Sequence, residues 1–213
     1  MKNIRFFHGK PILLYSIETA LKSGLFDAGV WVSTEDPAIA KIAWAAGAKV
    51  HPRQKALAQN EVGTQQVMRE VLLELYPPRS KDYEMPAIAC CIYATAPLMT
   101  VADLRGGLEA LVEGPTPYVY SVGPDGKDAG QWYWGIAGAF VDDVPLDHPR
   151  TKHVALPATR VCDINTYEDW ERARWLYRDM LQAACEHDLQ VVPNALQELV
   201  HLRCTKCGFS PPT

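Results

Sequence analysis

The sequence predicts an α/β three-layer sandwich, in which helices cover both faces of a mainly parallel β-sheet. Short apolar runs rich in β-branched residues alternate with amphipathic helical patterns, as in sheets built from crossover units. One run, Ala87–Tyr93, is apolar throughout, which is typical of a parallel strand buried on both faces. Ligands of such sheets bind at the carboxyl ends of the strands, so residues that follow predicted strands are the first candidates for function.

Local signals define each predicted element. Pro11 suits the first turn of a helix that Gly24 ends, Asp36 is placed to cap the second helix, and Pro77 stops the third. Between residues 123 and 160 the chain is rich in glycine, proline and aromatic residues, and no element is predicted there. In chain order the predicted elements are helix 11–23, strand 30–34, helix 37–46, strand 49–51, a helix from 64 that ends before Pro77, strand 87–93, helix 100–113, strand 117–122 and helix 167–184.

The composition narrows the class of protein. The 213 residues are 48% hydrophobic and 22% charged, with a formal net charge of -4, as in a soluble globular protein. Basic residues are scattered, which excludes nucleic acid as the expected partner, and the absence of a long apolar run excludes a membrane. The six cysteines have no disulfide-framework spacing, so reduced thiols and a cytoplasmic location are expected. We expect one domain over 1–185 and a tail over 186–213.

Six short stretches in fixed order carry a resemblance to a known family. They are Lys2–Ile4, Gly9–Ile17, Val32–Asp36, Tyr93–Leu98, Asp128–Gly135 and Val161–Thr166. This series resembles the cytidylyltransferases that make CMP-activated nonulosonic acids. Through Tyr93–Pro97 and Asp128–Gln131 it resembles the pseudaminic acid cytidylyltransferases in particular, and the CMP-N-acetylneuraminate (sialic acid) synthetases are the nearest relatives. The resemblance covers about residues 2–177.

The resemblance implies both a fold and a reaction. The fold is that of nucleotide-diphospho-sugar transferases, and the partners are CTP and an acidic nine-carbon sugar. A sugar hydroxyl attacks the α-phosphate of CTP, and pyrophosphate leaves while Mg²⁺ neutralises its charge. A CMP-sialic acid synthetase stays open as an alternative to the pseudaminic acid enzyme.

Metal binding is implied for the Asp163-Ile164-Asn165 stretch, which matches the family's Asp-Ile-Asp pair. In an extended segment, positions i and i+2 point to the same side, so Asp163 and Asn165 are expected to share one Mg²⁺, with Asp163 as the catalytic residue. Asn165 offers a neutral oxygen where relatives offer a carboxylate. The alternative is that Asp163 caps the helix that begins at Tyr167, a role that Thr166 would fill equally well.

Substrate roles are implied for six further residues. The alternatives are a solvated chain end for Lys2 and Asn3, a solvated charge for Arg53, and a simple chain turn made by Pro97 near Thr95. The aromatic run that follows Gln131, Trp132 to Trp134, is expected to pack in the core or in an interface rather than to form a stacking platform. The resemblance places Lys2, Asn3 and Arg53 by the nucleotide, and Thr95, Asp128 and Gln131 by the sugar.

Two departures from the family pattern leave other interpretations open. Relatives carry a strand and a glycine-rich basic phosphate loop before the Lys-Asn pair, whereas here Met1 directly precedes Lys2. The expectation is therefore a truncated chain whose first strand is missing. It is either an inactive remnant of the family or the product of a start codon assigned too late. The segment between Val122 and Asp128 is also short, which predicts a homodimer weakened by a reduced arm.

The C-terminal tail holds Cys204-Thr-Lys-Cys207, with His201 nearby. This spacing is half of a zinc site, and only His187 or Cys185 is near enough in sequence to add to it. We expect a tail with two uncoordinated thiols, and a zinc-binding interaction module is the alternative from a different functional class.

Overall fold

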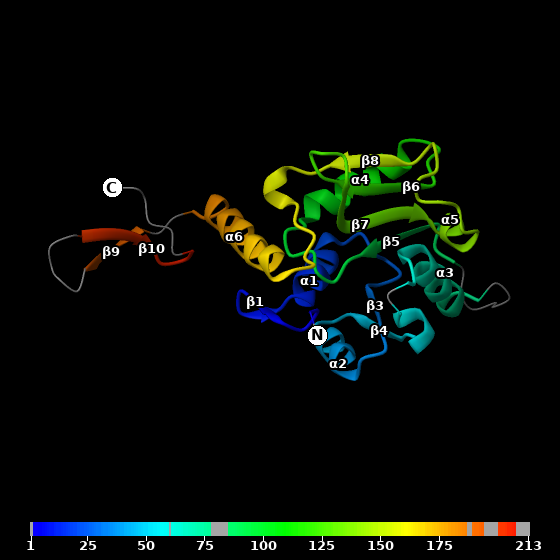
Figure 1. Ribbon diagram of the computed structural model, residues 1–213, viewed down its shortest axis with the longest axis horizontal. Coiled ribbons are helices and arrows are strands. Elements are labelled where there is room, and N and C mark those ends of the chain that lie inside the picture. The colour runs from blue at the N-terminus through cyan, green and yellow to red at the C-terminus, as the bar shows by residue number, and fades with distance from the viewer. Residues whose placement is uncertain (1, 60, 78–84, 187–188, 194–199, 208–213) are drawn as a thin grey trace. The chain divides into compact units, whose positions relative to one another are not determined.

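A computed structural model describes residues 2–59, 61–77, 85–186, 189–193 and 200–207. It contains two compact units, Met1–Asp163 and Ile164–Thr213, which are treated separately below (Figure 1). The domain boundary predicted after residue 185 stays a prediction. Within the described residues, no helix combines the length and the apolar character needed to span a membrane.

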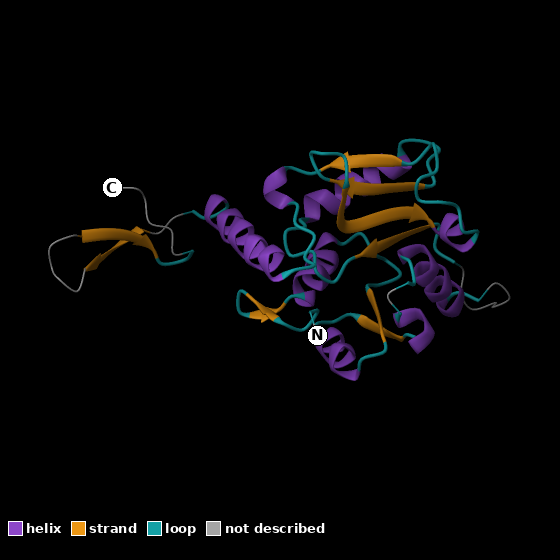
Figure 2. Ribbon diagram, viewed as in Figure 1, coloured by secondary structure: helices purple, strands orange, loops and turns teal. Residues whose placement is uncertain are grey.

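The first unit alternates strands and helices along the chain (Figure 2). Its strands are β1 (Phe6–Phe7), β2 (Lys10–Pro11), β3 (Trp31–Thr34), β4 (Lys49–Pro52), β5 (Ile88–Ile92), β6 (Tyr118–Val122), β7 (Asp128–Ile136) and β8 (Lys152–Ala155). Its helices are α1 (Leu13–Ser23), α2 (Pro37–Ala45), α3 (Thr64–Leu75), α4 (Val101–Val112) and α5 (Ala137–Val141), with 3-10 turns η1 (Lys55–Ala58) and η2 (Ala158–Arg160).

The largest sheet has the strand order β5-β7-β6-β8. Strand β7 is antiparallel to both of its neighbours, whereas β6 and β8 are parallel, so β5, β6 and β8 all run in one direction. The register pairs Tyr133 of β7 with Cys91 of β5 and with Tyr120 of β6. Strands β3 and β4 form a separate parallel pair, and β1 and β2 form a short hairpin.

Helices cover both faces of the four-stranded sheet. Val119 of β6 packs with Leu104 and Leu111 of α4, while its neighbour Tyr118 packs with Leu72 of α3 and with α5. Because successive residues of a strand point to opposite faces, α4 lies on one face and α3 with α5 on the other. The predicted α/β three-layer sandwich is confirmed, but this sheet is mixed rather than mainly parallel, because β7 is antiparallel to β5 and to β6. A further apolar cluster joins α1 and α2 to the β3–β4 pair.

Predicted caps explain where several helices begin and end. Asp36 accepts hydrogen bonds from the backbone N–H groups of Ala38 and Ile39 at 2.7 and 3.2 Å and so starts α2. Thr100 and Asp103 form a capping box at the start of α4, and Gly24 ends α1 in the left-handed conformation. Pro11 differs from expectation, because it pairs with Phe6 in the β1–β2 hairpin and α1 begins only at Leu13.

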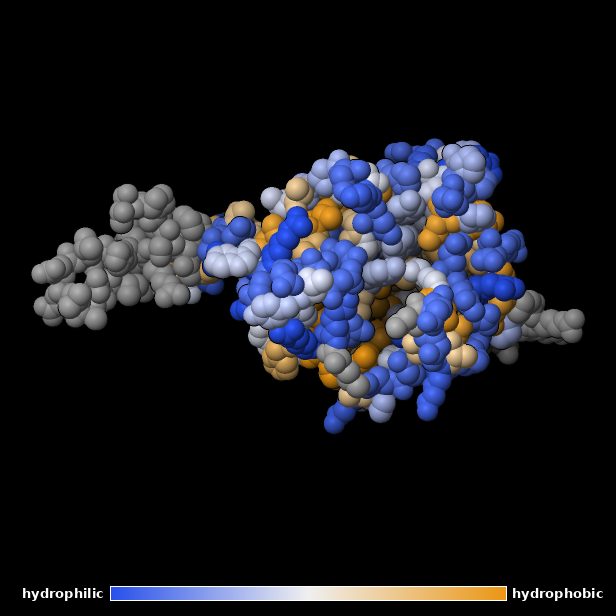
Figure 3. All heavy atoms as spheres, in the orientation of Figure 1, coloured by the Kyte–Doolittle hydropathy of each residue, from blue (hydrophilic) through white to orange (hydrophobic). Residues whose placement is uncertain are grey.

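Strand β7 was missed because its glycines resemble loop signals. Gly135 lies between the rings of Tyr118 and Phe140, where an added Cβ would stand 2.6 Å from each. Glycine is therefore needed in this strand for close packing rather than for a turn. The exposed surface of the first unit is mostly hydrophilic in the view of Figure 3, with a hollow over the region of β3 and α3 where apolar residues show.

The second unit consists of α6 (Tyr167–Ala183) and the antiparallel hairpin β9 (Leu189–Pro193) and β10 (Val200–Cys204). The predicted helix is confirmed, and Thr166 and Asp169 form the capping box at its start. The hairpin lies in the tail, for which no element was predicted.

Candidate active site

Three segments meet at one edge of the four-stranded sheet. They are the turn after β5, the first residues of β7, and the chain that follows β8. Because β7 is antiparallel to β5, its beginning lies beside the carboxyl end of β5, and the Tyr93 N–H donates to the Gln131 carbonyl at 2.9 Å. The chain after β8 is held to the end of β6 by the Leu156 N–H, which donates to the Val122 carbonyl at 2.8 Å.

Gly130 brings two predicted carboxylates into one neighbourhood. Its N–H donates to Asp128 Oδ1 at 2.8 Å, and a Cβ added to it would lie 3.5 Å from the carboxylate carbon of Asp163. Gly130 has a φ of +61°, a conformation that side-chain-bearing residues rarely adopt. The Asp128–Gln131 stretch and Asp163, 32 or more positions apart in the sequence, are thus neighbours in the fold.

Asp163 itself is exposed and is not the cap of α6. Thr166 fills that role, since its side chain accepts the N–H of Asp169. The capping alternative for Asp163 is therefore wrong. Asn165 is exposed, lies in the second unit, and donates its N–H to Asp169 Oδ2 at 3.0 Å. Its pairing with Asp163 on a metal stays a prediction.

Gln131 is buried and is fixed by its side-chain amide. Its Nε2 donates to the Arg160 carbonyl, and its Oε1 has no hydrogen-bond partner among the described residues. Arg160 in turn binds Asp103 at the start of α4, with Nη1 at 2.6 and 2.5 Å from the two carboxylate oxygens. The same nitrogen lies 3.1 Å from Thr100 Oγ1. Arg160 therefore links α4 to β7, and no sequence signal pointed to it.

A row of aromatic rings crosses one face of the sheet beside Asp128. Tyr93, Tyr133, Tyr120 and His153 come from four successive strands or their ends, with ring centroids 5.4, 5.5 and 4.6 Å apart. The Tyr133 hydroxyl donates to Asp128 Oδ2. Burial, together with hydrogen bonds to Asp128 and Tyr93, strongly raises the pKa of Tyr133, so this phenol stays protonated and acts as a donor.

The neighbouring tryptophans belong to the core. Trp132 and Trp134 are almost fully buried and pack with Leu104 and Leu111 of α4. The prediction that this aromatic run packs in the core is confirmed, and Tyr133 combines burial with its contact to Asp128.

The turn that carries Thr95 is anchored on both sides of the sheet. The Tyr93 carbonyl accepts from Ser16 Oγ of α1 at 2.7 Å, and the Tyr93 hydroxyl is 2.8 Å from Thr64 Oγ1 of α3. Thr95 itself is half-buried in this turn. Asn3 lies beside the start of α1, where its carbonyl accepts the N–H of Leu13 at 3.1 Å. Lys2 is exposed, and its carbonyl accepts the Arg5 N–H.

Arg53 is held at the carboxyl ends of β3 and β4. Its Nη2 donates to the Ser33 carbonyl at 2.8 Å, and its Nε lies 3.3 Å from Glu35 Oε2 without hydrogen-bond geometry. Burial raises the pKa of Cys91 on β5 to about 12, and the nearby Arg53 charge acts in the opposite direction. The alternative of a purely solvated Arg53 is therefore wrong.

Comparisons with known proteins identify the family to which the chain belongs. The family model for cytidylyltransferases matches residues 1–131. The pseudaminic acid cytidylyltransferase of Campylobacter jejuni is 29% identical, and the match covers 83% of this chain and 89% of that protein. N-acylneuraminate cytidylyltransferase A of Danio rerio is 32% identical over 57% of this chain and 26% of its own length.

A solved structure shows the same fold. The structure of Rv0371c in complex with manganese, from Mycobacterium tuberculosis, has a TM-score of 0.58 and 16% identity. The superposition covers 80% of this chain and 90% of that one. The family model alone spans more than half of the sequence, and both curated relatives are named as cytidylyltransferases. This chain therefore belongs to the cytidylyltransferase family.

Proposed function

We propose that this protein transfers CMP from CTP to a nonulosonic acid and releases pyrophosphate. The observation that carries the proposal is the neighbourhood of Asp163 and the Asp128–Gln131 stretch around Gly130, at the sheet edge where α/β folds bind ligands. Family membership and the names of the relatives support the same reaction.

Pseudaminic acid is the favoured acceptor. The Campylobacter jejuni pseudaminic acid enzyme matches along 83% of this chain, whereas the Danio rerio N-acylneuraminate enzyme matches along 57%. The longer match spans more of this chain. N-Acetylneuraminic acid is the second acceptor to test.

The donor set fits a hard divalent cation, and we propose Mg²⁺. Asp163 presents an exposed carboxylate beside Gly130. Mg²⁺ in nucleotide-dependent enzymes uses one or two carboxylates and completes its shell with water and substrate phosphates. Asp163 would hold the cation, which would neutralise charge on the departing pyrophosphate, and Asn165 as a second ligand stays a prediction.

The remaining groups would bind and orient the substrates. Arg53, Asn3 and Lys2 would lie by the nucleotide, where the Arg53 guanidinium, fixed by Ser33, offers charge to a phosphate. Asp128 would accept hydrogen bonds from sugar hydroxyls, and its own orientation is set by Gly130 and Tyr133.

Two of the predicted sugar residues differ in exposure. Thr95 is half-buried in its turn and would contact the sugar directly. Gln131 is 2% exposed and donates to the Arg160 carbonyl, which supports a positioning role for its side chain at the base of the sugar site. A buried amide oxygen that lacks a hydrogen bond, such as Gln131 Oε1, lowers stability unless the orientation of the amide benefits its neighbours.

The test measures pyrophosphate release from CTP and Mg²⁺ with each acceptor in turn. Asp163→Asn is expected to lower kcat/KM by about 100-fold or more, because even residues that only support metal ligands change activity by 10–100-fold. Asp27→Asn is the matched control, since Asp27 is an exposed carboxylate in a turn remote from these segments in sequence. Absence of pyrophosphate release with both acceptors, from folded wild-type protein, would overturn the proposal.

A further inference from the structure

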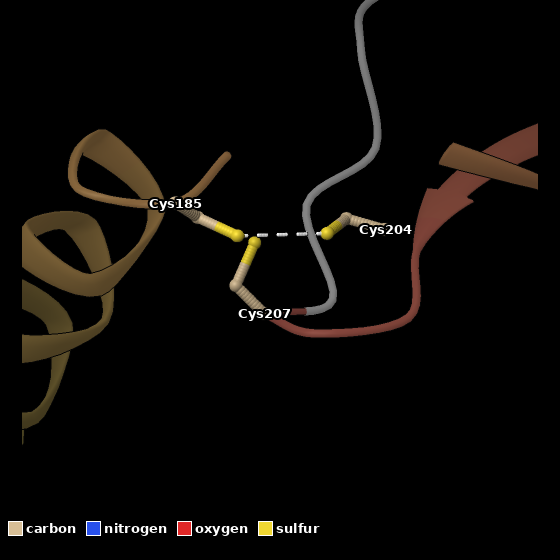
Figure 4. A group of neighbouring side chains, drawn as sticks. All are labelled: Cys185, Cys204 and Cys207. Atoms are coloured by element: carbon tan, nitrogen blue, oxygen red, sulfur yellow. Dashed lines mark hydrogen bonds between the residues drawn. The ribbon is translucent and has the colours of Figure 1, made fainter. Parts of the chain in front are cut away.

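The second unit gathers three cysteine side chains at one point. Cys185 follows the end of α6, Cys204 is the last residue of β10, and Cys207 lies in the turn after it. Their sulfur atoms face one another and all lie within 4.8 Å of each other (Figure 4). The structure therefore adds Cys185 to the Cys204 and Cys207 pair, which the sequence had suggested would remain uncoordinated.

The sulfur separations suit a metal better than a cross-link. Cys185 Sγ is 3.7 Å from Cys204 Sγ, far beyond the length of about 2.05 Å that a disulfide requires. A tetrahedral ion with Zn–S bonds of about 2.3 Å holds its sulfur ligands about 3.8 Å apart. The Cys185 and Cys204 sulfur atoms thus have the separation expected of two ligands on one zinc ion.

Sequence spacing supports the same conclusion. Cys204 and Cys207 are separated by two residues, as in the turns that supply two ligands to structural zinc. Cys185 comes from a different element, 19 residues before Cys204, as the ligands of a closed structural site commonly do. His187 lies outside the described residues.

The second unit also needs what a metal would provide. An isolated two-stranded hairpin is marginally stable in water. Cys204 is 1% exposed, so the hairpin buries this thiol at its end rather than exposing it. A metal shared with Cys185 would tie the hairpin to the end of α6, and small units with little apolar core often rely on such a staple.

The three thiols can act together as one ligand set, because a divalent cation deprotonates a coordinating thiol outright.

We propose that Cys185, Cys204 and Cys207 bind one structural Zn²⁺ as thiolates and so fix the β9–β10 hairpin to the end of α6. Binding forms three Zn–S bonds and releases three thiol protons to solvent. The fourth coordination position belongs to a nitrogen or oxygen donor. This site is separate from the proposed transferase site and does not depend on it.

The experiment uses the full chain, purified without added metal under reducing conditions. We expect about one zinc per chain by elemental analysis. Zinc-edge X-ray absorption of the wild-type protein should show three sulfur ligands, and this measurement needs no variant. Co²⁺ added to zinc-free protein in excess Mg²⁺ should give the visible and charge-transfer bands of tetrahedral cobalt thiolate.

Single substitutions then assign the ligands. Cys185→Ser, Cys204→Ser and Cys207→Ser should each weaken zinc binding by more than about 100-fold, beyond the 10–100-fold effect of residues that merely support ligands. Cys90→Ser is the control, because Cys90 lies on β5 in the other unit and should leave zinc binding unchanged. A zinc-free native protein, a zinc shell without sulfur, or a Cys185–Cys204 disulfide in freshly isolated protein would each overturn the proposal.

Discussion

The two units of this protein are stabilised by different means. Among its described residues, the first unit has apolar clusters that join helices to strands, and several of its large side chains, including Trp132, Tyr118 and Phe140, are fully buried. In the second unit, the described hairpin brings three thiols together at its end. The first unit is thus stabilised by hydrophobic burial, whereas the second unit, on the proposal above, depends on a zinc cross-link.

Metal removal should produce the largest difference in stability between the two units. A chelator that competes with thiolates for zinc is expected to abolish the hydrogen-exchange protection of β9 and β10, while the protection of β6 and β7 persists. The effect should be large, because structural zinc contributes roughly 10 kcal/mol of binding free energy to small domains. Equal loss of protection in both units would break the comparison.

Removing one core side chain should instead destabilise the first unit. Leu104→Ala in α4 is expected to lower the free energy of unfolding by about 3 kcal/mol, since Leu104 is fully buried against the sheet. Tryptophan fluorescence during denaturant unfolding provides the measurement, because Trp132 and Trp134 lie in the same cluster. Leu21→Ala, at a 42% exposed position, should cost much less.

The Arg160–Asp103 ion pair allows a partly buried pair to be compared with an exposed one. Asp103→Asn should lower the free energy of unfolding by about 2–3 kcal/mol, because it leaves the partly buried Arg160 charge without its partner. Arg174 and Glu171 form an exposed pair in α6, so Glu171→Gln should change stability by less than about 1 kcal/mol. A similar loss in both variants would contradict this account.

A smaller effect is expected at Gly130. Gly130→Ala should cost about 1–2 kcal/mol, because an L-residue is strained at a φ of +61°. The added Cβ would meet the Asp163 carboxylate at ordinary contact distance, so the stability change should come from the backbone rather than from a clash. Gly138→Ala is the control, because it has open space around it and no positive φ.

Much of the first unit was predictable from local sequence signals. Asp36, Thr100 and Gly24 act within a few residues of themselves, and the elements that they begin or end were predicted closely. Strand β7 could not be predicted this way, since Gly135 is required by the rings of Tyr118 and Phe140. Those contacts exist only after the sheet and α5 have assembled.

The site shows the same limit. Asp163, Asp128 and Gln131 were named from a resemblance to the family. Arg160 carries no local signal, because its meaning comes from Asp103, 57 residues away. The sequence offered Cys185 as one of two candidates to join Cys204 and Cys207, and the fold places its sulfur atom beside theirs. The missing first strand and the weakened homodimer stay predictions.

The account rests most directly on the identity of the reaction product. Mass spectrometry of a reaction containing CTP, Mg²⁺, pseudaminic acid and the full chain should detect the sugar acid joined to CMP, with one pyrophosphate released for each product molecule. Asp163→Asn should yield little of either. Hydrolysis of CTP to CMP without a sugar conjugate, or no turnover by protein with intact buried-tryptophan fluorescence, would contradict it.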